Sequence, residues 1–263
     1  MVDKVWLELL KRILETGQEI NPRGLATKEL LHQTISVEMT KPVLTCQTRK
    51  LNYRFMVAEA YWILSGDNTV TGISPYNKRI ADFSDDGITF AGAYGPKISN
   101  QLPYVVNKLL SDPCTRQAVL TIWQPNPQAS KDIPCTVALA FSIRNQALQA
   151  SVFMRSSDVW LGLPYDIFNF SMLSCYIAAL YNQKADVKIG LGKLNLTAAS
   201  SHLYQTVWEQ AENVVAEPKV YEQCQIPDNL YLEGATHLFN HLQAIRDLPS
   251  NLGHRWWKPC GSR

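Results

Sequence analysis

The sequence has few charged residues and no long run of apolar ones. Charged residues make up 18% of its 263 residues, and the formal net charge is +2. The basic residues are scattered, which excludes the electrostatic pattern of a protein that binds a nucleic-acid polymer or an anionic membrane. No segment approaches the roughly 18 apolar residues of a membrane span, and residues 1–17 lack the features of a signal peptide. We therefore expect a cytoplasmic protein that binds small molecules.

The sequence also lacks any C-x-x-C pair. Its six cysteines are far apart in the chain: Cys46, Cys114, Cys135, Cys175, Cys224 and Cys260. This spacing argues against a zinc site and against a disulfide-stapled scaffold. His237 and His241 stand four residues apart on a predicted helix, but no third metal ligand accompanies them. We expect no metal, and each cysteine taken alone is best interpreted as a small buried apolar side chain.

Apolar residues make up 46% of the chain, which is enough for a large core. The length is compatible with one domain. No linker or internal repeat divides the chain, so we predict a single domain over residues 1–263.

Hydrophobic periodicity and turn residues predict the main elements. Helices are expected at 2–16, 54–64, 164–181 and 233–246. Strands are expected at 117–123, 136–143 and 147–154. Residues 65–95 are rich in Gly, Asp, Asn and Ser and predict a surface excursion with short helical turns, and the glycines of 188–195 predict a turn. The tail at 254–263 has no assignable pattern.

Two places in this pattern carry chemistry. Arg155, Ser156, Ser157 and Asp158 follow a predicted strand, and an arginine beside a serine can hold a phosphate, although a solvated turn explains these residues equally well. Cys135 stands where a proline turn enters a buried strand, which favours either an exposed thiol at the mouth of the sheet or a buried core cysteine.

Three segments in order resemble the thymidylate synthase family: IPC at 133–135, MRSSDVWLGLPYD at 154–166 and SSHLY at 200–204. Further segments agree in register: NPRG around Arg23, the helix that carries Glu59, AYG at 93–95 and DPCTRQ at 112–117. The resemblance spans roughly residues 5–205. It implies an α/β (α+β) single-domain fold, in which helices back a twisted mixed sheet and two subunits pair through their sheets.

The resemblance implies a role for each matched residue. Cys135 is the nucleophile that adds to C6 of a pyrimidine, and Glu59 and Tyr94 organise water and proton transfer. The expected nucleotide ligands are Arg23, Arg155 and Ser156 for the phosphate, and His202 and Tyr204 for the sugar 3′-hydroxyl. The expected folate-side residues are Asp158, Ile80 and Gly162.

One phosphate ligand is expected to cross a homodimer interface. Arg116 matches the first of two adjacent arginines that the partner subunit donates, but Gln117 stands where the second would be. The site therefore has one cation fewer or recruits another basic residue, such as Lys131.

Asp166 stands where thymidylate synthases carry the asparagine that reads uracil. A carboxyl group can accept from the cytosine N4 amino group and, when protonated, donate to N3. The same substitution marks the deoxycytidylate hydroxymethylases, and Thr136 and Met154, in place of the usual His and Gln, also resemble that branch. The shielding tryptophan expected near Ile80 and Ala81 is missing, which predicts a wetter site.

These departures predict a one-carbon transfer from 5,10-methylenetetrahydrofolate to dCMP, completed by water that is activated near Glu59, which should have a raised pKa in its apolar helix. The product would be 5-hydroxymethyl-dCMP. The alternatives are the same reaction on CMP, the synthesis of 5-methyl-dCMP, and a non-catalytic homologue that only binds nucleotide or RNA.

Overall fold

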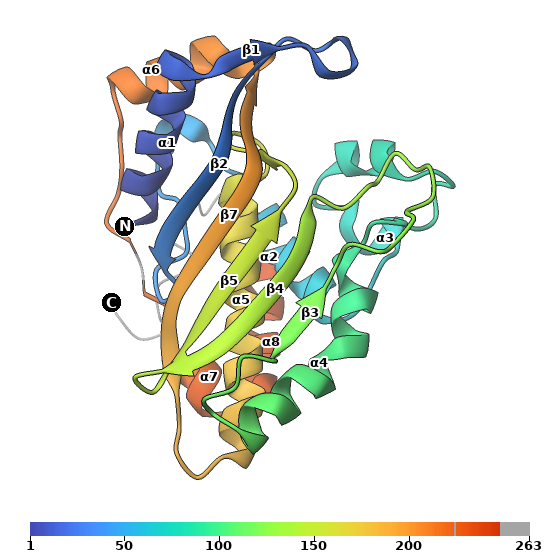
Figure 1. Cartoon of the computed structure of the whole chain (residues 1–263), viewed down its shortest axis with the longest axis vertical. Helices are drawn as coiled ribbons and strands as arrows, with labels where there is room; N and C mark the ends of the chain where they lie inside the picture. The colour runs from blue at the N-terminus through green and yellow to red at the C-terminus, as the bar shows by residue number, and fades with distance from the viewer. Residues whose placement is uncertain (224, 248–263) are drawn as a thin grey trace.

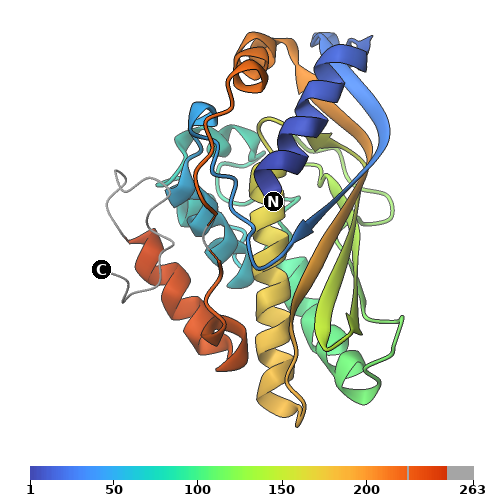
Figure 2. The ribbon, with the colours of Figure 1, turned by 90° about the vertical axis from the view of Figure 1, so that its left-hand side faces the viewer.

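One twisted, mixed β-sheet runs the length of the molecule, and the helices among the described residues cover only one of its faces (Figures 1 and 2). The structure is a computed structural model that describes residues 1–223 and 225–247. The strand order is β1-β2-β7-β5-β4-β3, and β6 pairs with β7. The strands are β1 (Gln18–Ile20), β2 (Thr27–Glu38), β3 (Val119–Thr121), β4 (Thr136–Arg144), β5 (Ala147–Met154), β6 (Ser157–Asp158) and β7 (Gly190–Tyr204).

Strand direction brings distant parts of the chain together at one end of the sheet. β4 and β5 form an antiparallel hairpin whose turn residues, Asn145 and Gln146, both have positive φ, as a two-residue hairpin turn of matching twist requires. β5 and β7 are parallel, so their connection has to cross over the sheet, and a long helix makes that crossing. The start of β4 and the ends of β5 and β7 therefore lie side by side.

The helices are α1 (Val2–Thr16), α2 (Tyr53–Leu64), α3 (Val70–Ile73), α4 (Tyr94–Ser111), α5 (Leu163–Lys184), α6 (Trp208–Ala216), α7 (Asn229–Leu232) and α8 (Ala235–Arg246). The crossover helix α5 has Pro164 in its first turn, where a missing N–H costs no hydrogen bond. It is buried on nearly every side, lying between the sheet and the layer formed by α2 and α8 (Figure 2). Because α5 is packed on nearly every side, the side chains on its first turns are held in fixed positions.

The predicted fold class is confirmed, and the predicted helices and the β4–β5 hairpin agree with the structure within a few residues. One prediction is wrong: Gly190 and Gly192 begin strand β7 and do not form a turn. The glycine at 192 leaves room for the side chain of Gln149, whose Nε2 lies 2.1 Å from where a Cβ would stand. The tail at 254–263 lies outside the described residues, as do Cys224 and Cys260. None of the described helices is both long and apolar enough to cross a membrane.

Candidate active site

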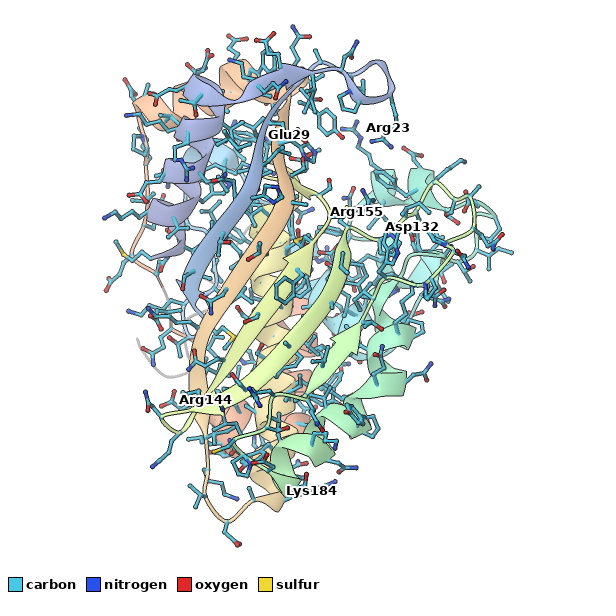
Figure 3. All side chains as sticks on the ribbon, in the orientation of Figure 1. Arg23, Glu29, Asp132, Arg144, Arg155 and Lys184 are labelled. Carbon is cyan, nitrogen blue, oxygen red and sulfur yellow. The ribbon has the colours of Figure 1, made fainter. Side chains whose placement is uncertain are left out.

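The three segments of the sequence signature meet at the end of the sheet described above. Thr136 pairs with Met154 across β4 and β5, and Met154 pairs with Ala198 on β7. Cys135 therefore lies directly beside Arg155. Strand β7 runs on from Ala198 to His202 and Tyr204 at the same end of the sheet. Figure 3 shows Arg155 and Arg23 at this end of the sheet and Arg144 at the opposite end.

Cys135 and Arg155 form the centre of the site. The Arg155 Nη2 lies 3.8 Å from the Cys135 Sγ, and the same guanidinium donates to the carbonyl oxygens of Ile133 and Pro134 at 2.9 Å each. Burial raises the pKa of the Cys135 thiol, and the positive charge of Arg155 opposes that rise. The turn before β4 thus holds a cation against a half-buried thiol, which is how a protein favours the thiolate form.

Two carboxyl groups on the helices connect to this centre: Asp166 interacts electrostatically with Cys135, and Glu59 interacts with Asp166. Asp166 lies in the first turn of α5, and Glu59 lies on α2. Burial raises the pKa of Glu59 to about 7. Burial, followed by the nearby Glu59 and Asp158 carboxylates, raises the pKa of Asp166 to about 8. At neutral pH Asp166 is therefore mostly a neutral acid that can both donate and accept a hydrogen bond, while Glu59 is close to half ionised.

Tyr94, the first residue of α4, connects the thiol segment to α5. Its Oη accepts a hydrogen bond from the Thr136 backbone N–H at 3.2 Å, and its ring stacks on Phe170 with 6.5 Å between centroids. Burial, together with the charges of Asp166 and Cys135, raises the pKa of Tyr94. The phenol stays protonated, so its O–H is a hydrogen-bond donor near the Cys135 thiol.

His202 and Tyr204 lie at the end of β7 with their ring centroids 5.1 Å apart. The strand register puts His202 between Glu29 on β2 and Asp158 on β6. Burial lowers the pKa of His202, and both carboxylates oppose that shift. The Arg23 Nη2 donates to the Tyr204 Oη at 3.4 Å, so a cation, a phenol and an imidazole are available together to an anionic, hydroxylated ligand.

The three predicted folate-side residues lie on two segments of the chain, the turn before α5 and a short 3-10 helix. Asp158 Oδ1 accepts the backbone N–H groups of Trp160 and Leu161 at 2.9 and 2.8 Å, which fixes the turn before α5. A Cβ on Gly162 would stand 3.3 Å from the Asp158 carbonyl oxygen and 3.4 Å from Asp166 Oδ2, so a glycine permits the close approach of this turn to Asp166. Ile80 lies in that 3-10 helix (Lys78–Phe83) and is half-buried against the core. Ser156 is half-buried beside Arg155.

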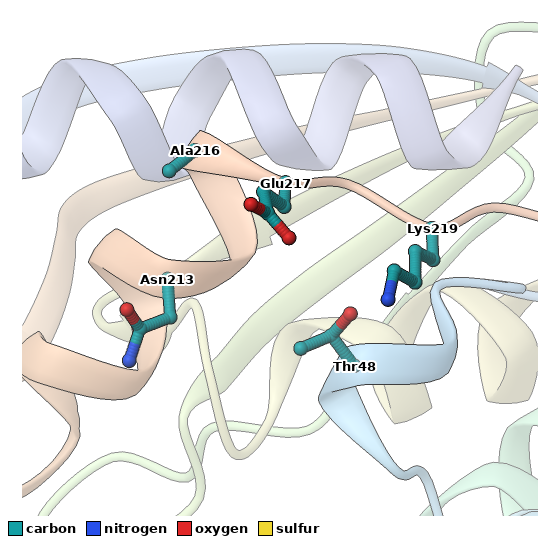
Figure 4. Close-up of a pocket in the computed structure, with 5 residues that line it drawn as sticks. All are labelled: Thr48, Asn213, Ala216, Glu217 and Lys219. Atoms are coloured by element: carbon teal, nitrogen blue, oxygen red, sulfur yellow. The ribbon is translucent and has the colours of Figure 1, made fainter.

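Arg116 is not part of this cluster within one chain. It is exposed, and it lies two residues before Ala118, whose carbonyl accepts the Phe141 N–H. At the usual rise per strand residue, Arg116 is on the order of 25 Å from Cys135. A pocket lined by Thr48, Asn213, Ala216, Glu217 and Lys219 also lies apart from the cluster, because it contains none of the predicted site residues (Figure 4).

One residue of the site was missed in the sequence. Asn169, on α5, donates its Nδ2 hydrogen bond to Glu59 Oε2 at 2.7 Å. A signal was present, because an asparagine three residues after Asp166 shares its helix face. Within the described residues, no group of three or more His, Cys, Asp or Glu side chains is placed to hold a metal ion.

Comparison with known proteins agrees with this arrangement. The thymidylate synthase family model matches residues 4–237. The chain belongs to the thymidylate synthase family. Enzymes of this family bind a nucleotide and use methylenetetrahydrofolate as co-substrate. The predicted membership is thereby confirmed.

A hydroxymethylase is among the relatives of this family member. The chain is 33% identical over 181 residues to the deoxyuridylate hydroxymethyltransferase of Bacillus phage SP01, an alignment that covers 60% of this chain and 47% of the relative. The chain thus matches about half the length of that relative.

Proposed function

We propose that this chain transfers a one-carbon unit from 5,10-methylenetetrahydrofolate to C5 of dCMP and that water completes the reaction, giving 5-hydroxymethyl-dCMP. The observation that carries the proposal is the half-buried Asp166 carboxyl, which is close enough to the Cys135 thiol for the two groups to interact electrostatically and which matches the position of the base-reading asparagine. The SP01 relative supports hydroxymethyl transfer as the reaction class.

The reaction begins at Cys135. Arg155 stabilises its thiolate, which adds to C6 of the pyrimidine and makes C5 nucleophilic. C5 then takes the methylene group of the folate, and loss of the C5 proton and of tetrahydrofolate leaves an electrophilic exocyclic methylene on the ring. Glu59, with its pKa near neutral pH, is suited to take a proton from the water that adds there. Arg23 and Arg155 carry the phosphate, and His202 and Tyr204 the sugar 3′-hydroxyl.

Asp166 selects the base. The protonated acid donates to the cytosine N3 lone pair and accepts a hydrogen bond from the N4 amino group. With its two oxygens placed for cytosine, the acid meets uracil donor to donor and acceptor to acceptor, which leaves groups unpaired at about 1–3 kcal/mol each. In that arrangement the preference for cytosine is roughly tenfold or more.

A second candidate substrate is dUMP. A neutral carboxyl group that exchanges its two oxygens can instead donate to O4 of uracil and accept from N3–H, and the SP01 relative is a deoxyuridylate hydroxymethyltransferase. CMP also remains a candidate, because His202 and Tyr204 contact the 3′-hydroxyl and leave the 2′ position unread. A methyl product or a non-catalytic binder are the further alternatives.

The same proposal includes a homodimer in which the open sheet face is the interface. One row across that face is formed by Thr34, Thr197, Phe153, Ala138 and Thr121. No described helix covers it (Figure 1), and Phe153 is 48% exposed. In such a dimer, Arg116 would reach the phosphate of the nucleotide bound in the active site of the partner subunit. Lys108, whose Nζ donates to Gln117 Oε1 at 3.1 Å, is our candidate for the second cation.

One assay tests the proposal. The purified protein is incubated with methylenetetrahydrofolate and dCMP, CMP or dUMP side by side, and the product masses, dihydrofolate and tritium release from C5 are measured. We expect dCMP to be turned over at least about tenfold better than dUMP, with a hydroxymethyl product and no dihydrofolate. Preferred turnover of dUMP would support the second candidate, dihydrofolate would indicate a methyl product, and no tritium release from any nucleotide would contradict catalysis.

A further inference from the structure

Asn169 is a buried amide inside the site to which the proposed reaction gives no role. Its side chain is 7% exposed. It follows Asp166 by three residues on α5, so both side chains point from one helix face toward the same region. Its hydrogen bond to Glu59, at 2.7 Å, joins α5 to α2 across this region.

The other end of the amide has no partner. Asn169 Oδ1 is buried without a hydrogen bond, and the same is true of Thr136 Oγ1 next to Cys135. A buried acceptor left unpaired costs about 1–3 kcal/mol, so natural proteins rarely keep one unless a water or a ligand group completes it. Because Nδ2 is held by Glu59, Oδ1 is turned away from that carboxyl and stays available.

We propose that Asn169 is the positioning residue that holds the attacking water beside Glu59, with Oδ1 accepting one proton of the water while the Glu59 carboxylate accepts the other. This inference rests on the proposed hydroxymethyl transfer. Two acceptors on one water fix both of its hydrogens and so direct an oxygen lone pair at the reacting carbon. The geometry converts a nearby water into an oriented nucleophile.

The chemical step is balanced without any further reactant. The water oxygen bonds to the exocyclic methylene carbon, the π electrons move into the ring, and the proton that faces Glu59 passes to its carboxylate. The ring electrons then re-form the C5–C6 double bond and expel the Cys135 thiolate. When the folate gives up its methylene bridge, its two nitrogens each gain a hydrogen. Over the whole reaction, one of these two protons comes from C5 and the other from water.

The test separates water addition from the earlier steps. Tritium release from C5-tritiated dCMP reports everything up to the loss of the C5 proton. Added 2-mercaptoethanol competes with water for the exocyclic methylene, so the ratio of thiol adduct to hydroxymethyl product reports how well water is held. In Asn169→Ala we expect this ratio to rise about tenfold, the value of one well-placed hydrogen bond, while tritium release stays within about threefold. Asn169→Leu keeps the branched shape of the side chain without its polar atoms and gives the same test if the alanine variant does not fold.

The matched control is Asn182, a second buried asparagine on α5, whose Nδ2 donates to the carbonyls of Ile189 and Tyr231 at 2.9 and 2.7 Å. Asn182→Ala should lower the melting temperature without changing the product ratio. A wild-type ratio in the Asn169 variants would overturn the inference while leaving the proposed function intact. A wild-type protein that releases no tritium from dCMP, CMP or dUMP would overturn the proposed function and this inference with it.

Discussion

The Arg155 guanidinium lies 3.8 Å from the Cys135 sulfur and is fixed there by two carbonyl oxygens of the same turn. Its charge works against burial, which raises the pKa of the thiol. A thiol at this position without the cation would be less reactive at neutral pH.

The first prediction follows from that pair. In Arg155→Gln the pKa of Cys135 should rise further, because the opposing charge is gone while the burial remains. Alkylation of Cys135 by iodoacetamide, followed across pH by peptide mass spectrometry, should reach half-maximal rate at a pH about one unit higher. Arg144→Gln, at the far end of β4 (Figure 3), is the control and should leave the alkylation profile unchanged. An unshifted profile in Arg155→Gln would remove this role from the arginine.

The second prediction concerns Asp166 and pH. Only the protonated acid donates to the cytosine N3, so binding is lost as pH rises through about 8. The KM for dCMP should therefore increase about tenfold per unit above that pH. In Asp166→Asn this pH dependence should disappear and the preference should move toward dUMP. Persistent dCMP preference in the variant would show that another group reads the base.

The third prediction concerns the stability cost of the same carboxyl. Its pKa in the folded protein is about 8, whereas an unfolded aspartate titrates near 3.9. The folded state therefore holds a proton that the unfolded state has released, and the free energy of unfolding falls as pH rises between these values. Asp166→Asn should raise the free energy of unfolding at pH 8 by more than about 1 kcal/mol, and the gain should vanish near pH 4. Denaturant titration at both pH values measures it. Asp186→Asn, an exposed position just after α5, should show no such difference.

The sequence predicted the parts of the fold that carry a local signal. Helix α5 is a long apolar run with a proline in its first turn, and the β4–β5 hairpin combines two β-prone runs with clear turn residues. Strand β2 was missed in the sequence for two reasons. Its outward side chains, such as Thr34 and Ser36, are polar, and the alternation of inward and outward side chains is interrupted near His32, which has a φ of 54°. Its pairing with β7 depends on contacts more than 150 residues apart in the chain, which no local pattern records.

The site divides in the same way. Cys135 and Arg155 could be predicted because their spacing resembles a known signature, and the structure joins them. Asn169 had only a weak signal, its place three residues after Asp166 on the same helix face. Its role becomes assignable only when the side chain opposite, Glu59, is known. Arg116 is predicted to act from the partner subunit, and within one chain it lies far from Cys135.

The fourth prediction tests the proposed interface. Phe153→Asp places a charge in the middle of the open sheet face, where pairing would bury it without a partner. We expect the wild-type protein to sediment as a dimer and this variant as a monomer in analytical ultracentrifugation. Val187→Asp is the control, because Val187 is 61% exposed just beyond α5, and that variant should remain dimeric. A dimeric Phe153→Asp protein would place the interface elsewhere.

The fifth prediction tests whether Arg116 acts across that interface. Arg116→Ala and Cys135→Ala should each be nearly inactive as homodimers, the first from loss of a phosphate contact and the second from loss of the nucleophile. A hybrid dimer contains one site that combines the intact Cys135 of one chain with the intact Arg116 of the other. Equal mixing with subunit exchange should therefore restore about a quarter of the wild-type activity, since half of the dimers are hybrids with one good site of two. If Arg116 instead served its own chain, no site in the mixture would hold both residues, and activity would stay at the level of the separate variants.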